Sequence, residues 1–299
     1  MTFHEGELLV QDRAGVRGEA RRVGQMLRTA IRPDAQTFLA KRRFAMVAAE
    51  GVGGQVWVSI LTGQPGFLVS SEDGIQLDVT VGPDIRDPIA AAISPGSSVG
   101  LLVISFAARR RYRVNGTVRS IGPGISIDVR EAFGNCPKYI HAYTKLPDGP
   151  VSHADPQTSD RLDDRQRRWI ESAETLFLGT MHPDAGADAS HRGGAAGFVR
   201  VTGPRTLVWG DYTGNRLFQS LGNTAVHPPA GLLFLEPETG STLQLTGNLE
   251  IDWSPEAAAT IPGAERVLRF SIEQVVERTG AIPLRWARGE TSPFNPPAR

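Results

Sequence analysis

Apolar residues recur at short, strand-like intervals through the first half of the chain, which predicts a β-rich protein. Runs of Val, Ile, Leu and Phe are separated by clusters of Gly, Pro, Asp and Ser, as expected for strands joined by turns. These runs predict first-half strands at 43–49, 55–61, 66–70, 74–81, 98–106, 110–121 and 124–129.

Helical spacing of apolar residues is found mainly near the start of the chain. Residues 5–31 predict helix with a break at Gly15 or Gly18, and Pro33 ends that segment and opens a short helix at 35–40. Asp87 followed by Pro88 predicts one more helix over 87–93, because aspartate and proline both favour a helix start. The first half is therefore predicted as helices around a meander of strands.

The second half predicts a similar succession of elements. Residues 146–160 are rich in Pro, Asp, Ser and Gly without periodicity, so we place a linker there, between a first domain at 1–145 and a second at 161–299. The second domain is predicted to have helices at 163–173 and 217–223, with strands at 176–181, 187–192, 197–202, 206–209, 230–235 and 241–251.

One sequence offset relates the two halves. Gly66-Phe67 recurs as Gly197-Phe198, Gly100-Leu101-Leu102 as Gly231-Leu232-Leu233, and Gly116 as Gly247, each 131 positions later. The offset rises to 145 between Ile127 and Ile272, which predicts an insertion near 254–263. Self-similarity at one offset indicates duplicated supersecondary units.

The stretch from Asp188 to Val201 is the strongest candidate for a binding edge. It contains His191, Arg192 and Arg200 beside Gly193, Gly194 and Gly197, so donors and flexible backbone coincide. We expect an anionic ligand to lie on this sheet edge, with Arg200 directed inward. The alternative is a glycine-rich surface hairpin whose charges are solvated.

A second group of polar residues suggests where a phosphate would bind. Arg216 follows a Gly214-Asn215 turn and precedes the predicted 217–223 helix, whose free amides and dipole favour an anion. Arg200 is expected to clamp the same phosphate. Thr242, Gln244 and Thr246 share one face of the 241–251 strand and are expected in the same pocket. Alternatively, Arg216 is a solvated helix-start residue and the threonines are strand formers.

Three stretches in a fixed order carry a resemblance to a known family. Residues 206–216 (TLVWGDYTGNR), 227–234 (HPPAGLLF) and 243–247 (LQLTG) resemble the pyridoxamine 5'-phosphate oxidase-like family of FMN-binding split barrels. With the repeat, the resemblance implies a mainly β fold with flanking helices, built as two tandem split β-barrels that form an intrachain pseudo-dimer. It implies FMN as the cofactor.

The resemblance also implies a set of cofactor-binding residues. Arg200 and Arg216 become phosphate ligands, residues 190–192 flank the ribityl chain and ring, and the candidate set is Ser190, His191, Arg192, Arg200, Asn215, Arg216 and Gln244. The first barrel has Ile60, Val69 and Ile85 where the second has His191, Arg200 and Arg216. We therefore expect a degenerate first site that serves as the partner wall through Trp57, Lys138 and Tyr139, with Arg86 replacing part of the lost charge.

Departures from the family pattern leave several functions open. Leu217 replaces the second basic residue of vitamin B6 oxidases, and residues 281–286 lack their arginine-rich motif. The favoured function is an FMN-dependent oxidoreductase acting with a small-molecule substrate or electron donor. The alternatives are a deazaflavin reductase, a non-catalytic flavin or electron-transfer module, a haem protein using His182, His191 or His227, and an interaction protein without a cofactor. No catalytic residue is assigned.

Composition narrows the expected partners. The chain of 299 residues has 32 basic and 32 acidic residues, which gives no global charge for nucleic acid or an anionic membrane. The single cysteine, Cys136, allows no intramolecular disulfide or cysteine-cluster metal site, and it is interpreted either as a small buried hydrophobe or as a redox thiol. No secretory or membrane-spanning pattern is predicted, so a cytoplasmic protein is expected, with homodimerisation left open.

Overall fold

The computed structural model describes residues 3–296 and begins with three short helices. These are α1 (Glu5–Arg13), α2 (Arg17–Gly24) and α3 (Pro33–Ala40). The break between α1 and α2 falls at Gly15, whose φ of 68° lies in the left-handed region that glycine adopts without strain. The helical segment was thus predicted with the right start and break, but it ends at Gly24 rather than Ile31.

The first half forms one antiparallel sheet of seven strands. Their order across the sheet is β2 (Val56–Thr62), β1 (Phe44–Glu50), β5 (Ser98–Ser105), β6 (Arg110–Ile121), β7 (Ile125–Asn135), β4 (Gln76–Val79) and β3 (Leu68–Ser70). The predicted helix at 87–93 is a single 3-10 turn, η1 (Pro88–Ala91), capped by the Asp87 side chain. Six of the seven strand predictions for this half agree with the observed strands to within two residues at each end, whereas the predicted strand at 124–129 stops six residues before the end of β7.

The second half forms a second sheet with the same strand order. That order is β11 (Gly186–Gly193), β10 (Thr175–His182), β14 (Pro229–Glu236), β15 (Ser241–Asp252), β16 (Arg266–Arg278), β13 (Thr206–Asp211) and β12 (Val199–Gly203). Helices α4 (Asp164–Ser172), α5 (Gln219–Val226) and α6 (Pro255–Ala259) accompany it. Part of the predicted linker is β9 (Gln157–Ser159), which pairs with β16, and β8 (Tyr143–Lys145) pairs with β17 (Trp286–Arg288).

Strand register repeats at the same offset as the sequence. Phe44 pairs with Thr62, and 131 positions later Thr175 pairs with Gly193. The last long strands require a correction, because Gly116 pairs with Val129 whereas Gly247 pairs with Ile272. Ile272 therefore corresponds to Val129 at an offset of 143, and not to Ile127 at 145. The extra residues form the loop that carries α6, where the insertion was predicted.

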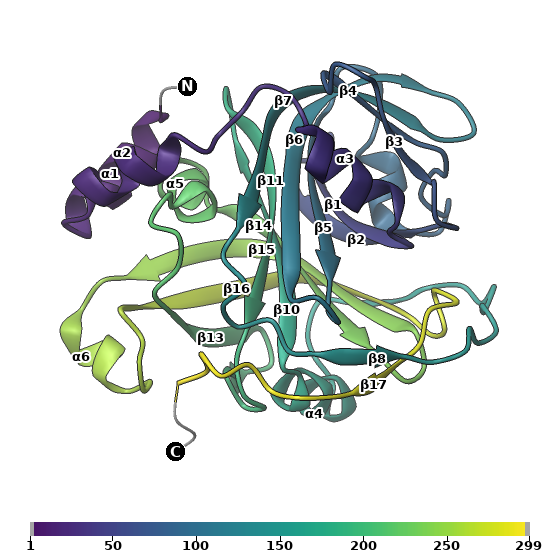
Figure 1. Cartoon of the computed structure of the whole chain (residues 1–299). Helices are drawn as coiled ribbons and strands as arrows, with labels where there is room; N and C mark the ends of the chain where they lie inside the picture. Colours follow the sequence, from purple (N-terminus) through teal and green to yellow (C-terminus); the bar gives the residue numbers. More distant parts are fainter. Residues whose placement is uncertain (1–2, 297–299) are drawn as a thin grey trace.

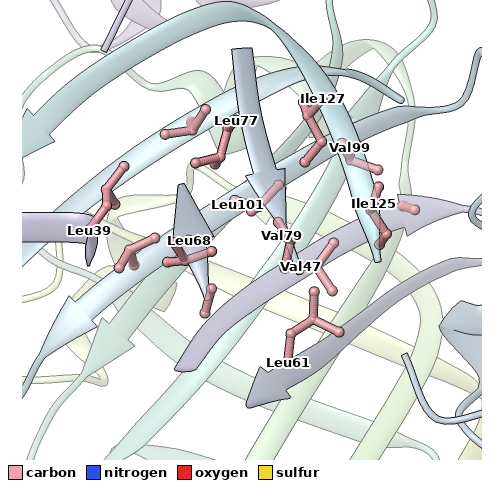
Figure 2. Packing of buried hydrophobic residues seen from close by; sticks show 14 of the residues in the cluster. Leu39, Val47, Leu61, Leu68, Leu77, Val79, Val99, Leu101, Ile125 and Ile127 are labelled. Carbon is pink, nitrogen blue, oxygen red and sulfur yellow. The ribbon is translucent and has the colours of Figure 1, made fainter. Parts of the chain in front are cut away.

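Each sheet covers its own hydrophobic core. Figure 2 shows the first core, where Val47, Leu101 and Ile127 from three strands meet Leu39 of α3. Trp209, Phe234 and Phe270 belong to the second core. A third cluster, which includes Met46, Phe177 and Leu233, contains residues from both sheets and joins the two halves. Alternation along the strands produces this arrangement, since one face fills the local core and the other faces the partner sheet.

The halves pack through small residues in reciprocal positions. A Cβ on Gly100 would lie 2.7 Å from the Asp188 Cα, and a Cβ on Gly231 would lie 2.5 Å from the Val56 carbonyl oxygen. Gly231 follows Gly100 by 131 positions, so each half presents the equivalent glycine to the other. This is the contact pattern expected of two similar units related by an approximate two-fold axis.

Helices from the first half reach across to the second half. In Figure 1, α1 and α2 lie beside α5 rather than over the first sheet, and Gln11 of α1 donates to the Leu217 carbonyl at 3.0 Å. None of the helices in residues 3–296 combines the length and apolar character that crossing a bilayer requires.

Replacing Gly100 with alanine tests this close packing. The added methyl group would meet the backbone of β11, so Gly100→Ala is expected to lower the free energy of unfolding by about 1–3 kcal/mol, the usual range for overpacking. Urea denaturation measures the change. Gly18→Ala is the control, since a Cβ there has no neighbour within 4 Å and its stability should be unchanged or slightly higher. Equal stability of the two variants would contradict the packing described here.

Candidate functional site

A pocket lies between the halves, at the start of α5. Strands β11 and β13 and the 213–216 turn supply one side, and β6 with the end of β7 supplies the other. Four arginines from both halves line it: Arg111, Arg113, Arg192 and Arg216. Four aromatic side chains complete the wall: Tyr139, Phe198, Tyr212 and Phe218. The pocket thus combines cationic groups with surfaces suited to a planar ligand.

The first amides of α5 open into this pocket without acceptors. Its N-cap residue, Phe218, provides no side-chain hydrogen bond. Among the described residues, the backbone amides of Gln219, Ser220 and Leu221 have no hydrogen-bond acceptor. Free amides and the positive end of the helix dipole together attract an anion.

Backbone strain is concentrated at the same place. Four non-glycine residues among those described have a left-handed φ, and three of them line the pocket: Tyr139 at 66°, Arg216 at 65° and Phe218 at 62°. Such conformations cost free energy and persist where the surroundings, often a functional site, impose them.

The arginines of the pocket differ in how their charges are balanced. Arg192 and Arg266 share the Asp211 carboxylate at 2.8 and 2.9 Å, and Arg113 contacts both Asp188 oxygens at 2.9 and 3.0 Å. Arg216 contacts Glu265 at 2.7 Å and is partly exposed. Arg111 forms no ion pair with the described residues. The pocket therefore retains positive charge at Arg111 and a displaceable pairing at Arg216.

The equivalent place in the first half contains an anion supplied by the chain. Asp87, the N-cap of η1, occupies the position 131 before Phe218. Its carboxylate accepts from the Ile89 amide, the Gln244 amide group and the Arg278 guanidinium, each at 3.0 Å, and also from the Ser59 hydroxyl. The first half thus fills with its own carboxylate the position that the second half leaves open.

Most of the predicted site residues reach the pocket. His191, Arg192, Asn215 and Arg216 line it. Ser190 lies directly behind, with its hydroxyl 3.0 Å from that of the pocket residue Ser220. The predicted phosphate helix also exists, although it runs from Gln219 to Val226 instead of 217–223.

Arg200 is not brought to the pocket. Val199 and Val201 on either side are buried in the second core, so alternation along β12 directs Arg200 to the opposite face. Its guanidinium donates to the Thr260 carbonyl at 3.2 Å, beside α6. The expectation that Arg200 points inward is therefore corrected.

Gln244 lies on β15 of the second half, but its side chain contacts the first half instead of the pocket. Its side chain is fully buried and donates to the Val58 carbonyl and to Asp87, both at 3.0 Å. By the 131 offset its equivalent is Arg113, which reaches into the second-half pocket in the same way. Strand β6 of the first sheet and strand β15 of the second sheet thus each send polar side chains into the opposite half. Arg111 and Arg113 were not predicted for that reason.

Of the residues expected to form the partner wall, one lines the pocket and the others lie elsewhere. Tyr139 lines the pocket and its hydroxyl donates to the Thr213 carbonyl at 3.1 Å. Trp57 is buried in the first core, and Lys138 lies over the Phe294 ring. Arg86 pairs with Asp84 at 2.6 Å. Only Tyr139 of this group is placed to contact a ligand in the pocket.

The glycines of the binding edge serve packing within the protein. A Cβ on Gly193 would lie 2.1 Å from the Tyr139 carbonyl oxygen, and one on Gly194 would lie 2.5 Å from the Phe198 Cβ. Only Gly197 of the three has a left-handed φ, at 83°. Gly193 therefore lines the pocket where the chain packs closely, Gly194 packs against Phe198, and Gly197 permits a left-handed turn.

The remaining candidates are Cys136 and three histidines, and two of these four residues lie at the pocket. His191 and Cys136 line the pocket, and Cys136 is a partly buried free thiol. His182 lies outside it, with Nε2 facing Glu5 and Nδ1 accepting backbone amides, and His227 faces Glu50 at 2.6 Å. Of the three histidines considered, His191 alone is at the site.

Comparisons with known proteins give no family assignment. No family model and no curated protein matches the sequence. Solved structures match about two fifths of the chain. A putative pyridoxamine 5'-phosphate oxidase from Lactobacillus delbrueckii is 16% identical over 39% of this chain and 94% of its own, with a TM-score of 0.33.

Two further solved structures match to a similar extent. The FAD-binding protein from Mycobacterium smegmatis is 14% identical over 40% of this chain and 98% of its own, with a TM-score of 0.28. The haem storage protein HutZ from Vibrio cholerae is 12% identical over 40% of this chain and 95% of its own, with a TM-score of 0.30.

Helix α1 supports α5 from behind through a buried carboxyl group. A Cβ on Gly222 of α5 would lie 2.6 Å from the Glu7 amide nitrogen, so the helices are in close contact. Burial, followed by the charges of Glu131 and Asp188, raises the pKa of Glu7 to about 8, although the His4 amide opposes this shift. Glu7 is therefore protonated in the folded protein at neutral pH.

Glu7→Gln should flatten the pH dependence of stability. Because the unfolded chain releases this proton near pH 4.5 and the folded chain retains it to about pH 8, wild-type stability falls as pH rises between these values. The glutamine variant lacks this loss, so its stability relative to wild type should increase from pH 5 to pH 8 in urea denaturation. Glu72→Gln, at an exposed turn, is the control. A constant difference across this range would disprove the buried protonated state.

Proposed function

We propose that the pocket binds a phosphorylated flavin, FMN, and that the chain is a flavin-dependent oxidoreductase. The observation that carries the proposal is the uncapped start of α5 beside Arg216, in a pocket with aromatic walls. The first half supports it as an internal comparison, because Asp87 provides a carboxylate at the equivalent helix start. A site built like that one and lacking its carboxylate is suited to an external anion.

The residues present fit such a cofactor. The amides of Gln219 and Ser220 with the guanidinium of Arg216 would hold the phosphate, after Arg216 releases Glu265. Tyr139 and Tyr212, whose ring centroids are 5.5 Å apart, offer flat surfaces for the isoalloxazine ring. The buried Nε of Arg192, which has no partner within the described chain, would gain a hydrogen bond from the ligand.

The fold proposed with this function is a pair of split barrels in one chain. The matching strand orders and registers favour duplication, and the reciprocal packing of Gly100 and Gly231 favours an internal pseudo-dimer. In this proposal the second domain, 161–299, provides the phosphate site, and the first, 1–145, provides the facing wall through Arg113 and Tyr139. Residues 146–160 connect them.

The electrostatics of the pocket favour electron or hydride transfer over acid–base chemistry. When bound, a flavin supplies a group that accepts and returns two electrons. Asp211 is held by two arginines, and burial beside Arg111 lowers the pKa of His191 well below its ordinary value. The Asp211 oxygens accept from two arginines and His191 Nδ1 accepts from Arg111, so neither group is placed to act as a general base. The residues of this chain would bind the cofactor and exclude water, and the same features suit an electron-transfer module.

Arg216→Gln tests the phosphate assignment. Loss of a charge-assisted contact worth about 1.5–3 kcal/mol should weaken FMN binding to the apo-protein by at least about tenfold, measured by calorimetry or flavin fluorescence quenching. The apo-protein should keep its stability, because the Arg216–Glu265 pair is partly exposed.

Arg200→Gln is the matched control, because this arginine faces α6 instead of the pocket. Its FMN affinity should equal that of the wild type. If Arg200→Gln weakens binding as much as Arg216→Gln, the phosphate does not lie at α5.

A further inference from the structure

The guanidinium of Arg111 enters the pocket from β6. Among the described residues it has no carboxylate partner, and its closest contact is a donated hydrogen bond to His191 Nδ1 at 2.8 Å. Burial and the neighbouring charges of Arg113 and Arg192 lower the pKa of Arg111 to about 9. The group is thus cationic at neutral pH in surroundings that disfavour its charge. An anionic ligand beside it would neutralise this charge.

Other donors beside Arg111 also lack partners. Because His191 Nδ1 accepts from Arg111, the neutral ring carries its proton on Nε2, and this buried N–H has no acceptor within residues 3–296. His191 is only 5% exposed. Asn135, paired with Arg111 in the β6–β7 register, has both side-chain amide atoms buried without a partner. We call Arg111, Asn135 and His191 the Arg111 corner.

A flavin phosphate at α5 would leave the Arg111 corner unsatisfied. Arg113, which contacts Gln219 at the helix start, is two residues along the strand from Arg111, a spacing of about 7 Å. The phosphate would neutralise Arg216 and the helix end. An oxidised flavin ring is neutral, so the positive charge of Arg111 would still need a second anion.

We propose that the Arg111 corner binds the carboxylate of a small substrate. A carboxylate is planar and accepts two parallel hydrogen bonds from a guanidinium, with further acceptance from His191 Nε2–H and the Asn135 amide group. The adjacent aromatic side chains would contact the body of the molecule. That this carboxylate belongs to a substrate rests on the proposed flavin site, whereas the anion-binding corner itself does not.

Benzoate is the probe, since it combines a carboxylate with a flat apolar body. Calorimetric titration of the full chain, both without FMN and after loading with it, should show benzoate binding. Arg111→Gln should weaken it by at least tenfold. Arg111→Lys, which keeps the charge but loses the planar fork, should retain part of the affinity. Arg110→Gln is the matched control, because Arg110 is exposed and pairs with Asp34 at the surface.

The outcomes separate this inference from the proposed function. It is supported if Arg111→Gln loses benzoate affinity while its FMN affinity and unfolding midpoint stay at wild-type values. It is overturned if benzoate binds the variant as tightly as the wild type, or if the variant loses FMN by a similar factor, which would assign the corner to the cofactor. Failure of FMN to bind the wild type would reject the flavin proposal. Benzoate titration of the wild type and of Arg111→Gln without FMN would still test whether the Arg111 corner binds a carboxylate.

Discussion

Close packing of two similar sheets is the constraint on which the rest of the structure depends. Gly100 and Gly231 allow strands of opposite halves to approach at backbone distance, and Gly179 packs against Ala48 and Val58 of the other half. At this distance Arg111 and Arg113 of β6 extend into the second half, and Gln244 of β15 extends into the first. The pocket is consequently composed of both halves.

The repeated scaffold gives the two equivalent positions opposite electrostatic states. Around η1, Asp87 caps the helix and receives Arg278, so that position is satisfied internally. Around α5, Phe218 replaces the aspartate and arginines replace neutral residues, leaving free amides and uncompensated positive charge. The strand orders of the two sheets correspond, but the helix starts differ in backbone as well as in side chains, since η1 is a 3-10 turn after an extended Asp87 and α5 is an α-helix after a left-handed Phe218. This contrast is the physical basis for proposing an external anion at one end of the molecule.

The sequence predicted most of the strands and the cationic turn before α5, because each depends on local pattern. It predicted no strand at β16. The prediction for Arg200 was wrong, because Val199 and Val201 on either side are buried in the core and alternation along the strand directs Arg200 to the opposite face. The sequence-based prediction assigned Gln244 to the wrong half because no local pattern shows which sheet a strand faces. Arg111 and Arg113 were detectable in principle, since the 131 offset pairs them with Thr242 and Gln244. The buried atoms of His191 and Asn135 that lack hydrogen-bond partners could be identified only from the three-dimensional structure.

The central claim is that, of the two equivalent helix starts within residues 3–296, the one at α5 lacks an anion supplied by the chain. Counting FMN molecules bound per chain tests this most directly, by calorimetric titration of the unloaded protein at known concentration. The account predicts one FMN per chain, because Asp87 occupies the equivalent position in the first half. Two equivalent sites per chain, or no binding at all, would contradict it.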